Sequence, residues 1–200
     1  MKQDNRKQEL IDATLHIVAD KGLESFAMKK VTQRAGTSEA LVYKYFETKE
    51  NLLYICYESV NQQIADFFDE VVISEMYDMK ELEKFSRDLW LSYFRFLVEN
   101  DYRTLYYFEY RSSQYIRKAR EEHRGEAHPV NQGFMSVMTE VFRKANLNLV
   151  EDGNVFWNYI LDTTGVFAKR CIRKELPRTD KCYNDIWKLL WGGMSNALER

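Results

Sequence analysis

Tyr43, Tyr45 and Lys49 bring two phenolic hydroxyls and one ammonium group into a single short stretch, YKYFETKENL at residues 43–52. Thr48 stands directly before Lys49 and is of a type that caps helices. The following helix would therefore begin here, with unpaired amides and the positive end of its dipole. Hydrogen-bond donors, a cation and a helix N-terminus together favour an anion. The chemistry that this stretch can do is binding of phosphate groups.

Two short helices and a tight turn must position this stretch. The pattern predicts one helix over residues 27–34 and another that begins at Thr37 or Ser38. Gly36 lies between them and can adopt a positive φ without steric cost. The hydroxyls of Thr37 and Ser38 can accept hydrogen bonds from the free amides of the second helix. Together with the apolar-periodic helix that precedes them, these elements have the arrangement of a helix-turn-helix.

The second helix of such a motif enters the major groove of DNA. We expect Leu41 to face the protein interior, and Glu39, Ala40, Val42 and Lys44 to face outward. On this pattern alone, an ordinary helix hairpin without any DNA partner is the alternative. The net charge of −2 does not decide between the two, although residues 1–50 carry a slight excess of Lys and Arg over Asp and Glu.

The run from Gly22 to Leu53 resembles the DNA-binding domain of the TetR family of bacterial transcriptional regulators. That family has a glycine after its first helix, an A-G-x-S turn and an ending of the form Y-x-[HY]-F-x-[ST]-K-[DE]-x-L. Here these features stand as Gly22, AGTS at residues 35–38 and YKYFETKENL at residues 43–52. The resemblance covers about the first quarter of the chain.

The resemblance implies which residues contact DNA. The family's usual contact positions carry Thr37, Ser38, Glu39, Ala40, Tyr43, Lys44, Tyr45 and Lys49. Tyr43, Tyr45 and Lys49 would hold phosphates, whereas Glu39, Ala40 and Lys44 are candidates for base edges. The chain departs from the family at Ala27, where Thr or Ser usually caps the preceding helix, at Thr32 in place of alanine, and at Ala40, where glycine is common.

The rest of the chain also predicts helices. Its 200 residues include only two prolines and eight glycines, and apolar residues recur at helical spacing with no strand pattern. The predicted helices are residues 49–71, 80–99, 102–122, 130–145, 154–174 and 179–198. The fold class is therefore all-α. We expect an N-terminal three-helix DNA-binding domain at residues 1–48 and a larger helical domain for effector binding and dimerisation at residues 49–200.

Eleven aromatic residues lie between Phe85 and Tyr115, more than one helix face can hold. Dense core packing is one explanation, and a pocket for a small hydrophobic or aromatic effector is the other. The resemblance favours the pocket, because the family binds small molecules among its middle helices. The candidate lining residues are Trp90, Tyr93, Phe94, Tyr106, Tyr107, Tyr110, Phe134, Met138 and Trp157.

The last two predicted helices carry long apolar stripes. Two DNA half-sites need two recognition helices, so we expect a two-fold homodimer. Packing of these stripes inside the monomer is the alternative. The candidate interface residues are Phe156, Ile160, Phe167, Ile186, Trp187, Leu190, Trp191 and Met194.

Nothing in the sequence points to catalysis or to a cofactor. The chain has no glycine-rich phosphate loop and no nucleophile elbow, and its three histidines do not predict a metal site. No run of 18 apolar residues predicts a membrane span, and the three cysteines are expected to be reduced thiols of a cytoplasmic protein.

These patterns together predict a transcriptional regulator, with a repressor as the expected type. It would bind double-stranded DNA at a palindromic operator under the control of a small effector. The alternative is a helical ligand-binding protein of the same fold that has lost specific DNA binding.

Overall fold

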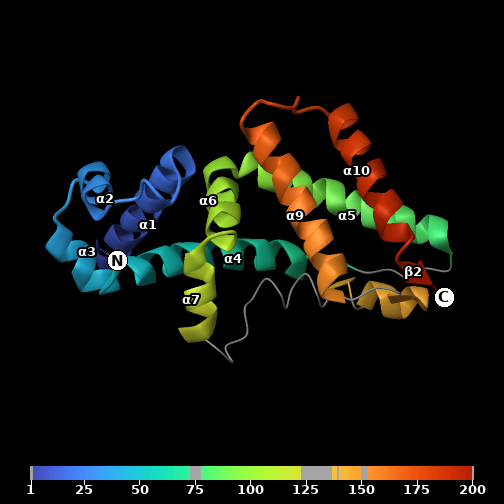
Figure 1. The fold of residues 1–200 in the computed structure, drawn as a ribbon, viewed down its shortest axis with the longest axis horizontal. Helices are drawn as coiled ribbons and strands as arrows, with labels where there is room; N and C mark the ends of the chain where they lie inside the picture. Colours follow the sequence, from blue (N-terminus) through green and yellow to red (C-terminus); the bar gives the residue numbers. More distant parts are fainter. Residues whose placement is uncertain (1, 73–77, 123–136, 139, 150–152, 200) are drawn as a thin grey trace. The chain divides into compact units, whose positions relative to one another are not determined.

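The computed structural model describes residues 2–72, 78–122, 137–138, 140–149 and 153–199 (Figure 1). The chain forms helices almost throughout, which confirms the all-α prediction. The helices are α1 (Lys2–Lys21), α2 (Met28–Ala35), α3 (Glu39–Phe46), α4 (Lys49–Asp69), α5 (Met79–Glu99), α6 (Asp101–Arg111), α7 (Gln114–Glu122), α9 (Gly153–Ile172) and α10 (Asp180–Ser195). Residues 140–145 are helical as well.

Two short strands were not predicted. β1 (Asn148–Leu149) pairs antiparallel with β2 (Leu198–Glu199), with Asn148 opposite Glu199 and Leu149 opposite Leu198. Each strand has only two residues, too few for an alternating pattern to be visible in the sequence.

Packing divides the chain into two compact units. Unit 1 comprises Met1–Ile64 and Tyr102–Pro129, and unit 2 comprises Ala65–Asp101 and Val130–Arg200. Helix α4 supplies residues to both. The functional boundary that we predicted between residues 48 and 49 stays a prediction, because packing alone does not report function.

In unit 1, the helix-turn-helix packs on α1, and α6 is fastened to both α1 and α4. The Arg103 guanidinium on α6 binds the carboxylate of Asp12 on α1 at 3.0 Å. The hydroxyl of Tyr106, also on α6, is fully buried and donates to the backbone carbonyl of Leu53 on α4 at 2.6 Å. One polar contact to α1 and one to α4 therefore hold α6 in place within the unit.

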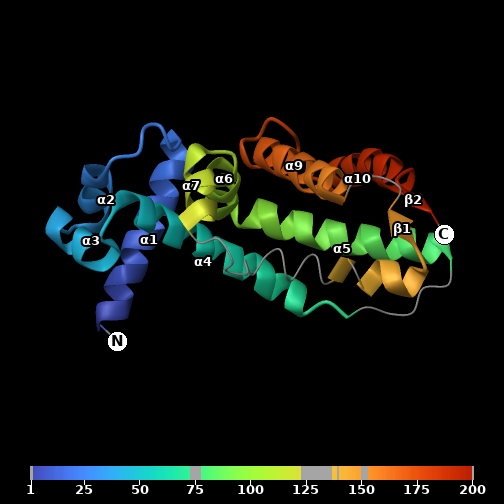
Figure 2. The same cartoon turned by 60° about the horizontal axis from the view of Figure 1, so that its bottom comes forward.

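In unit 2, α5 lies alongside α9 and α10, as Figures 1 and 2 both show. Asp78 caps α5 by accepting from the amides of Lys80 and Glu81. Arg87 on α5 donates to the side-chain oxygen of Asn184 on α10 at 3.0 Å. Among the described residues, no helix combines the length and the apolar character needed to cross a lipid bilayer.

Candidate nucleic-acid interface

The turn between α2 and α3 has the geometry that its sequence predicts. Gly36 lies in the left-handed region at φ 59°, and its amide donates to the carbonyl of Thr32, which ends α2. Ser38 is the N-cap of α3, where its hydroxyl accepts from the amide of Leu41 at 3.4 Å. Ala27 makes no side-chain cap hydrogen bond to α2, as the departure from the family pattern suggested. Backbone geometry and one cap therefore set the direction in which α3 begins.

Helix α3 turns a different face to the core from the one we predicted. Val42 is fully buried, whereas Leu41 is only half-buried, so the expected orientation of these two residues is wrong. The reason is Phe46, which is also fully buried and lies one helical turn after Val42 on the same face. Glu39, Ala40 and Lys44 are exposed as predicted, and Tyr43 is exposed as well.

A second capped helix begins directly after α3. The Thr48 hydroxyl accepts from the amide of Asn51 at 3.0 Å, so Thr48 caps α4 as predicted. The Asn51 side chain donates to the carbonyl of Phe46 at 2.9 Å and ties this N-terminus to the end of α3. Glu47 links the two helices at φ 62°, a conformation that a residue with a side chain adopts only when its surroundings hold it there.

Lys49 has partners that the sequence reasoning missed. Its ammonium lies 5.4 Å from the ring centre of Phe26 and 5.5 Å from that of Tyr115, within the range of a cation–π contact. Phe26 precedes α2 and Tyr115 belongs to α7, so both rings are distant from Lys49 in the sequence. The ammonium is therefore held by two rings of unit 1 at the very helix end predicted to receive a phosphate.

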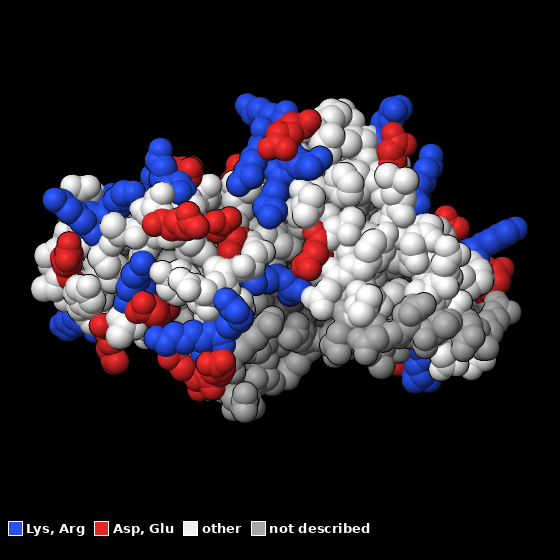
Figure 3. Space-filling view, viewed as in Figure 1, with Lys and Arg blue, Asp and Glu red and all other residues white. Residues whose placement is uncertain are grey.

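The eight predicted DNA-contact residues lie on one continuous segment, the turn, α3 and the first residue of α4. On the face shown in Figure 3, Lys and Arg are interspersed with Asp and Glu over α1, α2 and α3. Helix α2 adds exposed Lys29, Lys30 and Arg34, which our sequence analysis did not name. They come from the helix before the recognition helix, so the signal that could have found them was the basic run around α2 rather than the family motif.

The DNA-binding segment is similar to known proteins. Residues 10–54 match the family described as "Bacterial regulatory proteins, tetR family". Residues 10–54 carry the DNA-binding helix-turn-helix of this family. The HTH-type transcriptional regulator BetI of Cronobacter sakazakii is 33% identical over 64 residues, which is 32% of this chain and 32% of BetI. The match thus spans about a third of the length of the curated relatives.

Solved structures extend the likeness to the whole TetR-family fold. A TetR family transcription regulator from Marinobacter aquaeolei has a TM-score of 0.70 at 22% identity, covering 96% of this chain and 97% of that one. The regulator FadR from Bacillus subtilis, solved in complex with stearoyl-CoA, has a TM-score of 0.67 at 18% identity, covering 93% and 98%. At these identities the likeness establishes the fold alone.

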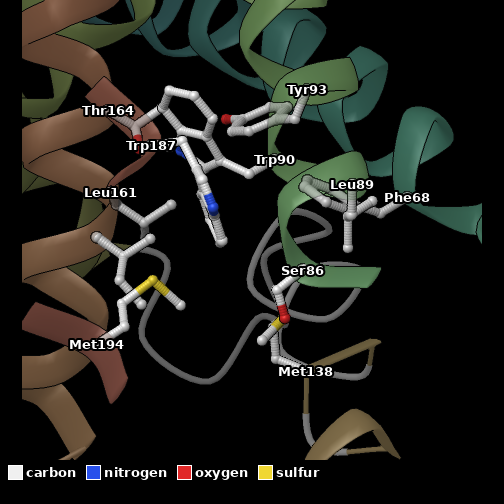
Figure 4. Close-up of a pocket in the computed structure, with 11 residues that line it drawn as sticks. Phe68, Ser86, Leu89, Trp90, Tyr93, Met138, Leu161, Thr164, Trp187 and Met194 are labelled. Atoms are coloured by element: carbon white, nitrogen blue, oxygen red, sulfur yellow. Dashed lines mark hydrogen bonds between the residues drawn. The ribbon is translucent and has the colours of Figure 1, made fainter. Parts of the chain in front are cut away.

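Unit 2 contains a cavity among α4, α5, α9 and α10 (Figure 4). Three predicted effector residues, Trp90, Tyr93 and Met138, line it. Phe94 does not; it is fully buried and packs on Tyr183, with ring centres 4.9 Å apart. Trp157 stacks on Phe142 instead, and Phe134 lies outside the described residues.

The three tyrosines predicted for the pocket belong to unit 1. Tyr107 and Tyr110 stack on Tyr57 of α4, with ring centres 5.3 and 4.9 Å apart, and Tyr106 is buried beside them. Burial raises the pKa of Tyr57, Tyr106 and Tyr110 above the ordinary range of a phenol, so all three stay neutral. These rings of α6 pack in the core around α4, apart from the cavity that Trp90, Tyr93 and Met138 line, and their contact with an effector stays a prediction.

Most of the predicted dimer residues are buried inside the chain. Six have at most 5% of their surface exposed, namely Phe156, Ile160, Ile186, Trp187, Leu190 and Met194. Phe167 and Trp191 are partly exposed. The apolar side chains that α9 and α10 do expose are Val155, Tyr159, Val166 and Leu189. This corrects the predicted stripe, because apolar periodicity marks the face of a helix that packs within its own chain.

Substitutions at Gly36 and Gly192 can test the effect of backbone conformation without the effect of steric crowding. A Cβ would meet no atom within 4 Å at either Gly36 or Gly192, but only Gly36 has a positive φ. We expect Gly36→Ala to lower the free energy of unfolding by about 1 kcal/mol, since an L-residue is disfavoured in that conformation. Gly192→Ala, inside α10, should raise it by about 0.5–1 kcal/mol. Urea unfolding measures both, and a shift of the same sign would contradict this account of the turn.

Proposed function

We propose that this chain is a DNA-binding transcriptional regulator that acts as a repressor at a palindromic operator. The observation that carries the proposal is an exposed α3 face set between two capped helix N-termini, at Ser38 and Thr48. Such N-termini favour phosphate oxygens, and an exposed helix of this motif reads base edges in the major groove. As such a regulator, the protein works in the cytoplasm and is not an enzyme.

Residues along the turn, α3 and the start of α4 have different roles in this proposal. Thr37, Ser38, Tyr43 and Tyr45 supply hydroxyl donors to phosphates and set the register on the duplex. Glu39, Ala40 and Lys44 face the base edges, where Glu39 can accept from a cytosine amino group. Val42 takes no part, because it is buried in the core.

Selection of binding sites from a random duplex library, at two salt concentrations, tests this function. A recovered palindrome would support it, and the half-site spacing would give the distance between the two recognition helices. No enrichment at either salt concentration would favour the alternative function, a ligand-binding protein of the same fold without specific DNA binding.

Lys49 serves as a phosphate contact that must leave its two aromatic rings to bind. Lys49→Ala should weaken binding to every sequence and reduce the slope of log affinity against log salt by about one. Lys80→Ala is the matched control, since Lys80 is an exposed lysine on α5 in unit 2. Fluorescence anisotropy across a salt series measures both slopes. An unchanged slope in Lys49→Ala would remove Lys49 from the phosphate contacts.

Dimerisation uses the outer faces of α9 and α10, which leave Tyr159, Val166 and Leu189 exposed. Leu189 is 72% exposed, so Leu189→Glu should leave the monomer folded while placing a charge in the interface. We expect monomers in sedimentation velocity. Val72→Glu is the control, because Val72 is 84% exposed and lies outside these helices. An intact Leu189→Glu dimer would move the interface to another surface.

A small hydrophobic or aromatic effector bound in the cavity of unit 2 controls DNA binding. FadR of Bacillus subtilis, which shares the fold, was solved in complex with stearoyl-CoA, and the long acyl chain of that ligand supports an effector with an apolar part. Helix α4 supplies residues to both units, with Lys49 at its first position. The effector acts by binding more tightly to an arrangement of α4 in which the two recognition helices no longer fit the operator. Equal affinity for both arrangements would shift nothing.

A further inference from the structure

An indole N–H of a residue that lines the cavity of unit 2 has no hydrogen-bond partner among the described residues. Trp187 lines the cavity and is only 2% exposed, and its indole N–H has no hydrogen-bond partner within the described part of the chain. Trp90 lines the same cavity and offers a direct comparison. Its indole N–H donates to the hydroxyl of Thr164 at 2.9 Å. Burying a donor without a partner costs free energy, so the N–H of Trp187 points to an acceptor that the described residues do not supply.

The walls of the cavity decide which molecules can bring that acceptor. None of the described lining residues carries a charge, and most are aromatic or aliphatic, including Phe68, Ile160 and Leu161 (Figure 4). A charged ligand would lose its hydration without gaining an opposite charge. The lining also includes the hydroxyl-bearing residues Ser86, Tyr93 and Thr164, and none of them accepts from the Trp187 indole N–H.

The size of the cavity sets a further limit. It measures about 30 Å³, which is room for roughly two water-sized groups. Met138 and Met194 form part of its wall, and unbranched thioether side chains rearrange easily. A compact molecule can therefore enter by displacing these side chains, with its apolar body against the methionines and its polar atom at the indole.

We propose that this cavity binds an uncharged, mainly apolar molecule with a single hydrogen-bond acceptor, such as a ketone or ester oxygen. Trp187 Nε1–H donates to that oxygen and is the specificity-determining group of the site. The inference names the ligand class of the effector cavity and, for its part in regulation, rests on the proposed function. The binding step itself does not depend on DNA.

Two probes of the same shape isolate the hydrogen bond. Cyclohexanone and methylenecyclohexane differ by an oxygen in place of a CH₂ group, and cyclohexanecarboxylate adds a charge. The four tryptophans of the chain give four indole N–H signals in the NMR spectrum of ¹⁵N-labelled protein, and Trp187→Phe identifies one of them. We expect the ketone to move the Trp187 signal downfield. The ketone should bind roughly threefold to tenfold more tightly than the hydrocarbon, and the carboxylate should not bind.

Variants complete the test. Trp187→Phe should abolish the preference for the ketone, whereas Trp157→Phe should retain it, because Trp157 does not line the cavity. Equal affinities of the two uncharged probes for the wild-type protein, or a ketone that leaves the Trp187 signal in place, would overturn the inference without any variant. Operator binding measured with the ketone present separates the two proposals. A shifted Trp187 signal with unchanged DNA affinity would support the ligand class and contradict effector control.

Discussion

The structure of unit 1 depends on the burial of Val42 and Phe46, which holds a helix too short to form alone. Helix α3 has eight residues, and isolated helices of that length are not stable in water. Its two fully buried side chains dock it, while Ser38 satisfies an amide at its start and Asn51 a carbonyl at its end. Because the face of α3 with Val42 and Phe46 packs in the core, the opposite face is exposed to solvent. The exposed recognition surface is thus a consequence of packing.

Helix α6 packs against the helices that carry the DNA-binding segment. Tyr107 and Tyr110 of α6 stack on Tyr57 of α4, and burial raises the pKa of Tyr106 and Tyr110 above its usual value. Arg103 contributes the charged contact of α6, to Asp12 on α1. Stacked rings, the Arg103–Asp12 ion pair and the hydrogen bond from Tyr106 to Leu53 therefore connect α6 with the helices that carry the DNA-binding segment. The rings of Phe26 and Tyr115 hold Lys49 in the same unit.

Local signals in the sequence were sufficient for the turn, the caps and the helical character of the chain, but not for the two short strands or for which helices pack together. Gly36, Ser38 and Thr48 act through neighbours a few residues away, so turn and caps could be predicted. In an eight-residue helix, Leu41 and Val42 fit the apolar pattern equally well, and only the docking of Phe46 decides between them. Periodicity also identified the apolar faces of α9 and α10 without telling whether a partner or the chain's own α5 covers them. The packing of Tyr106, Tyr107 and Tyr110 around α4 could not be predicted for the same reason, because which helix lies opposite is a property of the fold.

The paired indoles of unit 2 show how a ligand site can be kept without instability. The rings of Trp90 and Trp187 lie 5.8 Å apart, and Trp187 also stacks on Trp191 at 5.4 Å. Burial of a large ring contributes about 4–6 kcal/mol, which exceeds the roughly 1–3 kcal/mol that one unmatched N–H costs, so the chain can keep this N–H unmatched and stay folded. The unmet hydrogen bond is then available only to a ligand that carries an acceptor. An apolar molecule of the same shape gains the burial but leaves the N–H unmatched, so the selectivity of the cavity lies in a single atom of Trp187.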